Sequence, residues 1–155
     1  FLYHILQLLF KLVITNLLEG KKVPIYGEGK NIRDWLYVDD HCRAIDMILN
    51  QGQIGKTYLI GGMTENINNN QILHLICQLM NKKFDNSVEY IKNRPGHDLR
   101  YAVDWSETEK ELNWRPKHNF HDWLQKTIEW YTNNSSWWQR IKTGQYLEYY
   151  RKQYG

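Results

Sequence analysis

Residues of the kind that build metal and redox sites are scarce in this 155-residue sequence. Its two cysteines, Cys42 and Cys77, lie far apart and lack histidine support, which argues against a disulfide framework and a zinc site. We expect both to be reduced thiols in the core of a cytosolic protein. His118 and His121 have the spacing of a metal-binding pair, but no third ligand is nearby, so the sequence predicts no metal site.

A glycine-rich phosphate-binding turn is also missing. The sequence has neither a G-x-G-x-x-G string nor a P-loop, and Ile32 stands where a third glycine would follow Gly27 and Gly29. Tyr26 and Lys30 have the spacing of a Tyr-x-x-x-Lys catalytic pair, but the two glycines between them disfavour the helix that such a pair needs. The sequence therefore predicts no cofactor-binding turn and no catalytic group in this chain.

A strong excess of charge of one sign is lacking as well. The net charge is +3 and the basic residues are spread along the chain, whereas a nucleic-acid surface shows a basic stripe. The apolar stretch 1–18 has no basic leader or cleavage site, and Lys11 and Asn16 interrupt it. We expect no nucleic-acid or membrane partner, and we interpret this stretch as an internal helix of a chain that begins within a longer protein.

Short apolar and β-branched segments alternate with amphipathic ones, which predicts an α/β fold. Asp39 or Asp40 is expected to cap the second helix. Residues 21–30 form a short extended piece that ends in a glycine-flanked turn. The expected helices span about 6–19, 39–50, 68–79, 106–112 and 119–131, and the expected strands span 35–38, 57–60, 88–91 and 101–103.

Several helix ends carry specific signals. Gly20 and Asn113 stand where a left-handed residue closes a helix. Asn68, with Gln71 three positions later, resembles a capping box, and Asn119 is the expected cap of the last long helix. These signals predict the boundaries of four helices.

Two uncommon strings indicate a family. They are PIYGEGKNIRDWLYVDDHCRAI, at 24–45, and NRPGHDLRYAVD, at 93–104. Followed by ELNWRP and IEWY, they resemble nucleotide-sugar dehydratases of the extended short-chain dehydrogenase/reductase family. The resemblance implies that 1–155 is a C-terminal sugar-nucleotide-binding region whose Rossmann half is absent. Within it, 1–20 would be a divergent N-terminal helix and 135–155 an aromatic tail that packs against the rest.

The resemblance also implies an activity for the parent protein. Such an enzyme uses NAD to convert dTDP-glucose to a 4-keto-6-deoxy sugar, in deoxysugar biosynthesis, as a cytoplasmic homodimer. The family's NAD-binding and catalytic residues lie upstream of the region present here. We therefore expect no catalytic and no cofactor-binding residue in this chain, which would hold the nucleotide end of the substrate.

Ten residues match the family's substrate-binding positions. The resemblance implies that Arg33, Arg94 and His97 contact the diphosphate or ribose, and guanidinium groups suit a diphosphate. Tyr26 would lie against the thymine, and Asn68 would reach the nucleotide end. The full set is Pro24, Ile25, Tyr26, Arg33, Asn68, Asn93, Arg94, Pro95, Gly96 and His97.

Plainer interpretations of these residues stay open. Arg33 could pair with Asp34 or Asp39 on the surface. Arg94 and His97 could brace their loop through Asp98. Tyr26 could be a half-buried strand residue, and Asn68 only a helix cap.

The function also has alternatives. The chain departs from the family in its first 11 residues, where Leu8 replaces a substrate-contacting lysine. It could be part of another nucleotide-sugar epimerase or decarboxylase of the superfamily, or a non-catalytic remnant or binding module.

We expect the isolated chain to be poorly soluble or to associate. In the family, the segments that match 35–38 and 57–60 belong beside a large nucleotide-binding sheet, and without it they would expose apolar faces and unpaired edges. Size-exclusion chromatography tests this expectation. Elution as a stable monomer that unfolds cooperatively would contradict it.

Overall fold

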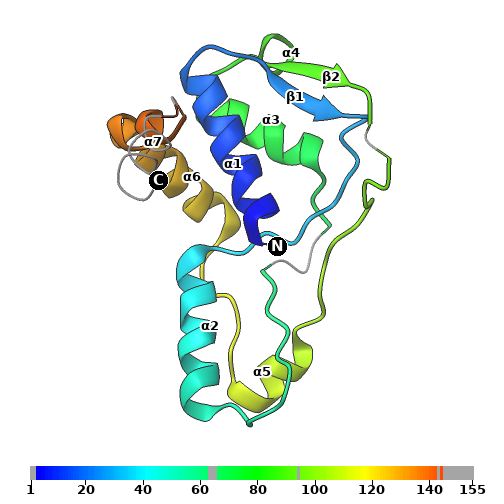
Figure 1. Ribbon diagram of the computed structural model, residues 1–155, viewed down its shortest axis with the longest axis vertical. Coiled ribbons are helices and arrows are strands. Elements are labelled where there is room, and N and C mark those ends of the chain that lie inside the picture. Colours follow the sequence, from blue (N-terminus) through cyan, green and yellow to red (C-terminus); the bar gives the residue numbers. More distant parts are fainter. Residues whose placement is uncertain (1–2, 63–65, 94, 143, 145–155) are drawn as a thin grey trace, which may run out of the picture.

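The computed structural model describes residues 3–62, 66–93, 95–142 and 144, and Figure 1 shows an elongated molecule with two lobes. The lower lobe holds α2 (Val38–Gln51) and α5 (Ser106–Leu112). None of the helices in the described part of the chain has both the length and the apolar character needed to cross a membrane. The upper lobe holds α1 (Tyr3–Leu18), β1 (Val23–Tyr26), α3 (Asn69–Leu79), α4 (Phe84–Ser87), β2 (Val88–Ile91), α6 (Phe120–Asn133) and α7 (Ser135–Lys142).

The two strands form a parallel sheet at one end of the upper lobe (Figure 1). Val23 pairs with Val88, and Tyr26 pairs with Ile91. The long connection between the strands includes α2 and α3, as a parallel pair requires a crossover. Because both strands run in the same direction, the turn after Tyr26 and the loop after Ile91 leave the sheet at the same end.

Most of the core lies in the upper lobe, where buried side chains of α1, α3 and α6 pack together. Phe10 of α1 makes edge contacts with Trp35 and Trp123, at 4.8 and 5.4 Å between ring centroids. A smaller core in the lower lobe joins Ala44 of α2 to Leu112 and Trp114. Trp35 thus anchors the segment between the lobes in the upper core, because burying a large apolar side chain contributes roughly 2 kcal/mol.

The predicted helices are confirmed, and so are the ends marked by Gly20, Asn68, Asn113 and Asn119. Gly20 and Asn113 have φ values of 70° and 52°, the left-handed conformation expected at these ends. Asn68 and Gln71 form the predicted capping box, with each side chain accepting a backbone N–H of the other residue. Asn119 caps α6 through its side-chain oxygen. The extended piece at 21–30 and the strand at 88–91 are confirmed as β1 and β2.

Three predicted strands are wrong. Residues 35–37, 57–60 and 101–103 form no strand, and α2 begins at Val38. The apolar residues of these segments reflect burial, as for Trp35, or exposed apolar surface, as for Leu59 and Val103 at 48% and 39% exposure. A strand needs a neighbouring backbone ladder, and none of these segments has one, although Tyr101 N donates to Ile32 O at 3.0 Å.

Further sequence predictions need correction. Neither Asp39 nor Asp40 caps α2, because the N-cap position is Tyr37 and Asp40 is buried one turn further on. Cys77 is a buried free thiol, and burial raises its pKa although Ser87 lowers it in part. Cys42 is also a free thiol, but it is exposed on α2 rather than in the core.

The aromatic tail is described only to residue 142 and at 144. Within that part, Trp138 is 1% exposed, and its Nε1 donates to Tyr131 O at 2.8 Å. Lys142 donates to Asn16 Oδ1 and Glu19 Oε2, both at 3.0 Å, which joins α7 to the end of α1. The expected packing of the tail therefore holds for α7, while residues 143 and 145–155 lie outside the described residues.

The carboxylate of Asp40, 1% exposed, joins the lower lobe to the loop that leads into α6. Its Oδ1 accepts from Lys117 N and Arg43 Nη2, both at 3.0 Å, and its Oδ2 accepts from His118 N at 3.1 Å. Trp114 Nε1 donates to Asp40 O at 3.2 Å. Burial alone raises the pKa of Asp40, but the hydrogen bonds from Lys117, Arg43 and His118 outweigh it and place the pKa below its ordinary value.

Replacing this carboxylate with Asp40→Asn should lower the free energy of unfolding by roughly 2 kcal/mol or more, since an amide cannot accept all of these bonds. Because the folded pKa lies below the unfolded one, the carboxylate's contribution is complete above the unfolded pKa and is lost as pH falls through the folded pKa.

Urea unfolding and thermal melts between about pH 7 and about pH 3 measure both effects. The Asp40→Asn variant should lose less stability on acidification than the parent chain. Asp46→Asn, which changes an exposed carboxylate of the same helix, serves as the control. Equal acid sensitivity of the parent chain and Asp40→Asn would contradict the assignment.

Candidate functional site

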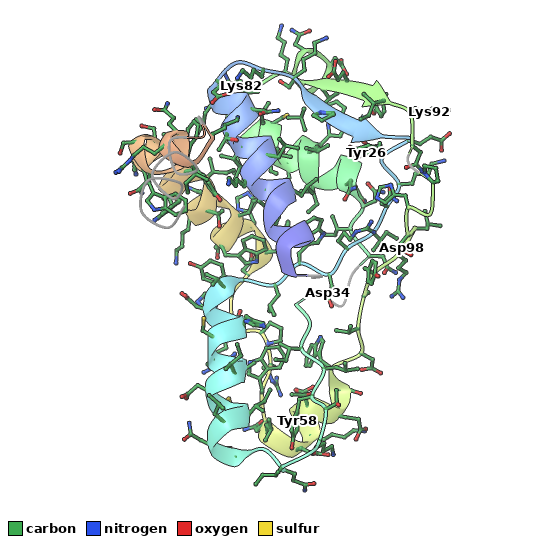
Figure 2. All side chains as sticks on the ribbon, in the orientation of Figure 1. Tyr26, Asp34, Tyr58, Lys82, Lys92 and Asp98 are labelled. Carbon is green, nitrogen blue, oxygen red and sulfur yellow. The ribbon has the colours of Figure 1, made fainter. Side chains whose placement is uncertain are left out.

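The turn after β1 and the loop after β2 meet beside the end of the sheet. Gly27 N donates to Ile91 O at 2.9 Å, and Gly27 has a φ of 57°, which favours glycine. A Cβ on Gly27 would lie 3.2 Å from Asn93 Cβ, so a side chain here would press on the second loop. Tyr26, 44% exposed, is the last residue of β1 and lies at this junction (Figure 2).

Arg33 is only 8% exposed and contacts the second loop. Its Nη1 donates to Ile32 O at 2.6 Å, and its Nη2 donates to Asp98 O at 3.1 Å. The guanidinium also lies 5.6 Å from the centre of the Tyr101 ring. Its orientation is thus fixed before any ligand arrives, and the interpretation of Arg33 as a surface residue is wrong.

His97 connects Arg33 to the two loops. Its Nε2 is 3.1 Å from Arg33 Nη2, and its Nδ1 is 2.7 Å from Asn93 Oδ1. Because a guanidinium can only donate, Nε2 must accept, which leaves the proton of a neutral ring on Nδ1, where it donates to Asn93. The ring also makes an edge contact with Tyr26, at 5.8 Å between centroids. Tyr26, Arg33, Asn93 and His97 therefore form one contact cluster, which we call the Arg33 cluster.

The remaining predicted site residues lie around this cluster with different exposures. Pro24 is half-buried in β1, while Ile25 is 2% exposed, so its side chain belongs to the core rather than to a ligand-facing surface. Pro95 and Gly96 are exposed in the second loop. Arg94 lies outside the described residues, as does the side chain of Leu8.

Asn68 is tied to the cluster through the backbone. Ile32 makes an antiparallel bridge with Asn68 and a parallel bridge with Arg100, so Asn68 lies beside the residue that precedes Arg33. Its Oδ1 accepts from Gln71 N at 3.0 Å. The cap role is therefore confirmed, and a ligand role stays a prediction.

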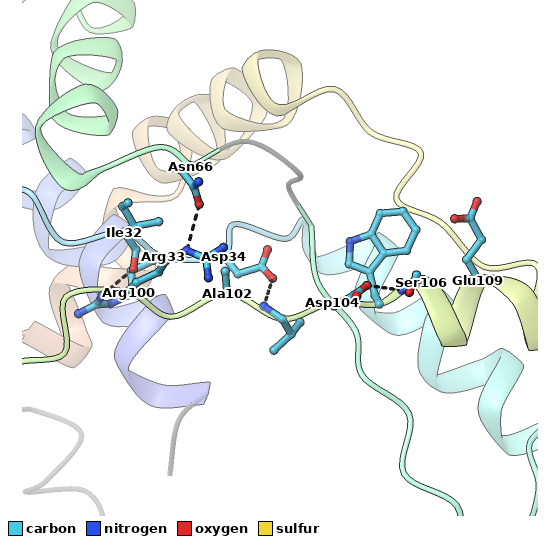
Figure 3. A pocket seen from close by; sticks show the side chains of 11 residues that line it. Ile32, Arg33, Asp34, Asn66, Arg100, Ala102, Asp104, Ser106 and Glu109 are labelled. Carbon is cyan, nitrogen blue, oxygen red and sulfur yellow. Dashed lines mark hydrogen bonds between the residues drawn. The ribbon is translucent and has the colours of Figure 1, made fainter.

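Arg33 also lines a pocket of about 340 Å³ (Figure 3). Arg100 lies in its wall, where its Nε donates to Asn66 Oδ1 at 3.2 Å. Asp104 and Glu109 lie in the same wall. Sequence reasoning missed these residues, although Arg100 and Asp104 lie in the second family-like string, because nothing in the pattern said that they would gather beside Arg33.

The described residues offer binding groups. Lys30, the partner in the apparent Tyr-x-x-x-Lys pair, instead bonds Glu28 Oε2 at 2.6 Å, and residues 27–30 form a turn rather than a helix. No three His, Cys, Asp or Glu side chains of the described ranges gather to hold a metal ion. The arrangement can bind an anion through Arg33 and a flat ring beside Tyr26.

Comparisons with known proteins agree with this arrangement. A family model described as GDP-mannose 4,6 dehydratase matches residues 4–127. The dTDP-glucose 4,6-dehydratase of Shigella flexneri is 42% identical over 158 residues, which cover 98% of this chain and 44% of that protein. The chain thus spans less than half the length of this relative, and it matches the relative's C-terminal part.

Solved structures of the same enzyme are also similar. The dTDP-glucose 4,6-dehydratase of Bacillus anthracis, in complex with NAD, has a TM-score of 0.80 at 43% identity and covers 86% of this chain and 42% of that one. The enzyme from Streptomyces venezuelae, with NAD and TYD bound, has a TM-score of 0.82 at 39% identity and covers 86% and 41%. The expected fold, a C-terminal portion of an extended short-chain dehydrogenase/reductase, is confirmed.

Proposed function

Because the chain belongs to the GDP-mannose 4,6 dehydratase family, we propose that it binds the nucleoside diphosphate end of dTDP-glucose for an NAD-dependent dTDP-glucose 4,6-dehydratase. The observation that carries this proposal is the Arg33 cluster, in which a buried guanidinium lies beside an exposed aromatic ring. A diphosphate and a thymine are the two chemical groups that such a pair suits.

Arg33 is the proposed diphosphate ligand. Its described contacts include two backbone carbonyls and an imidazole that accepts from it, and these orient the guanidinium. Low exposure strengthens its attraction for an anion, because less water screens the charge. Arg94 is proposed to contribute the second guanidinium, as the family resemblance implies.

Tyr26 and the loop residues are proposed to hold the base and ribose. The Tyr26 ring is exposed at the end of β1 and is braced by the edge of His97. An aromatic face of this kind suits a flat heterocycle. Asn68, Asn93 and His97 provide polar groups nearby, while Pro24, Pro95 and Gly96 complete the proposed walls.

The chemistry of the parent enzyme is proposed to lie in the part of the relatives that this chain does not span. NAD would supply the hydride acceptor there, and the chain's own sequence has no glycine-rich turn to bind it. Binding the nucleotide end orients the sugar, and this remote binding energy lowers the barrier at the reacting carbons. We further propose that the parent enzyme is a cytoplasmic homodimer.

The 155-residue chain should bind dTDP, bind UDP more weakly, and turn over no dTDP-glucose in the presence of NAD⁺. Isothermal titration measures the two affinities, and absorbance of the 4-keto product in alkali measures turnover. Tighter binding of UDP would favour an epimerase or decarboxylase parent. Absence of binding to either nucleotide would contradict the proposal, and detectable product would contradict the upstream location of catalysis.

The Arg33→Lys variant should bind dTDP about tenfold more weakly, because an ammonium cannot reproduce the planar bidentate geometry of a guanidinium. Arg115→Lys is the matched control, since the exposed Arg115 pairs with Glu109 on α5. Unchanged affinity of Arg33→Lys would remove Arg33 from the site.

A further inference from the structure

Asp34 lies where three extended segments cross between the two lobes (Figure 2). Its Oδ1 accepts from Gly62 N at 2.7 Å, and its Oδ2 accepts from Val103 N at 3.4 Å. One carboxylate thus bonds two backbones that belong to segments 57–62 and 101–105. These segments contain 57–60 and 101–103, which the sequence predicted as strands, and the Asp34 side chain bonds their backbones where no strand ladder forms.

Two glycines opposite Asp34 allow the backbone of segment 57–62 to come close to it. A Cβ on Gly61 would overlap Asp34 Oδ2 and crowd Val103 Cγ2. A Cβ on Gly62 would overlap the carbonyl of Trp35. Both glycines therefore allow a close approach of backbone to the Asp34 segment that no larger residue permits.

The same segments carry Arg33 and its partners. On one side of Arg33, Ile32 N donates to Leu99 O at 2.8 Å, and Tyr101 N donates to Ile32 O at 3.0 Å. On the other side, Asp34 bonds Val103. Arg33 is thus held between two attachments to the stretch 99–103, which continues directly from the loop that contains His97.

We propose that Asp34 is a positioning residue for nucleotide binding, whose carboxylate fixes the segment 99–103 so that Arg33 meets His97 at the diphosphate site. This inference rests on the proposed function. Asp34 is not among the residues proposed to contact the ligand. Its effect on binding would pass through the placement of the Arg33 guanidinium.

The chemistry requires a carboxylate of this length. Both known partners are N–H donors, and an ionised carboxylate accepts with both oxygens. An asparagine would turn an NH₂ group toward one of the two N–H groups and lose that bond. A glutamate is one methylene longer, so its oxygens would not lie at the same distances from the two N–H groups.

The test uses Asp34→Asn in the 155-residue chain. Its dTDP affinity should fall about tenfold, and thermal unfolding should remain cooperative. Nitrogen-15 spectra of the imidazoles report on His97 without ligand, with the His97 signal assigned through His97→Gln. The parent should show a Nδ1–H ring, and Asp34→Asn should shift the ring toward a mixture of tautomers as Arg33 moves away.

Two further variants sharpen the result. Gly61→Ala displaces the Asp34 carboxylate without changing its charge. It should reproduce both the fall in dTDP affinity and the change in the His97 ring. Asp122→Asn, which changes an exposed carboxylate on α6, should change neither.

The outcomes separate this inference from the proposed function. An unchanged His97 ring in Asp34→Asn and Gly61→Ala would overturn the inference, as would loss of cooperative unfolding in both variants. If the parent chain binds no dTDP, the proposed function fails. The His97 signal then decides whether Asp34 positions Arg33.

Discussion

The arrangement of the two lobes depends on one buried carboxylate. Asp40 lies in the first turn of α2 in the lower lobe. It accepts hydrogen bonds from Arg43 and from the backbone of Lys117 and His118, in the loop that enters α6 of the upper lobe. A buried carboxylate without such donors would be strongly unfavourable. The loop that contains Lys117 and His118 is therefore held next to Asp40. Because α2 follows directly after the segment of Arg33, the position of this loop also constrains the candidate site.

The candidate site depends in turn on the direction of two short strands. Parallel pairing sends the turn after Tyr26 and the loop after Ile91 out of the same end of the sheet, and so brings Arg33 to His97, 64 positions away. The guanidinium is then oriented by carbonyls and by a neutral imidazole before a ligand binds. Preorganisation of this kind reduces the ordering that binding must otherwise accomplish.

The local signals in the sequence predicted local structure well. Gly20, Asn113 and the Asn68–Gln71 box mark helix ends because their conformations and hydrogen bonds involve neighbours only a few residues away. The segments 35–38, 57–60 and 101–103 were predicted as strands and form none. Their sequence could not decide this, because a strand exists only where another backbone lies alongside it. Exposed Leu59 and Val103 mark surface that this chain leaves uncovered.

The sequence by itself determined the family, the helices and the residue types of the site, since motifs and helix caps are properties of neighbouring residues. Only the tertiary structure decided that Arg33 is buried against His97, that Ile25 faces the core, and that Arg100 and Asp104 gather in a pocket beside Arg33. It also decided that the carboxylates of Asp34 and Asp40 accept hydrogen bonds from backbone N–H groups. Contacts of this kind join residues far apart along the chain, and burial fixes them only when the whole chain has packed.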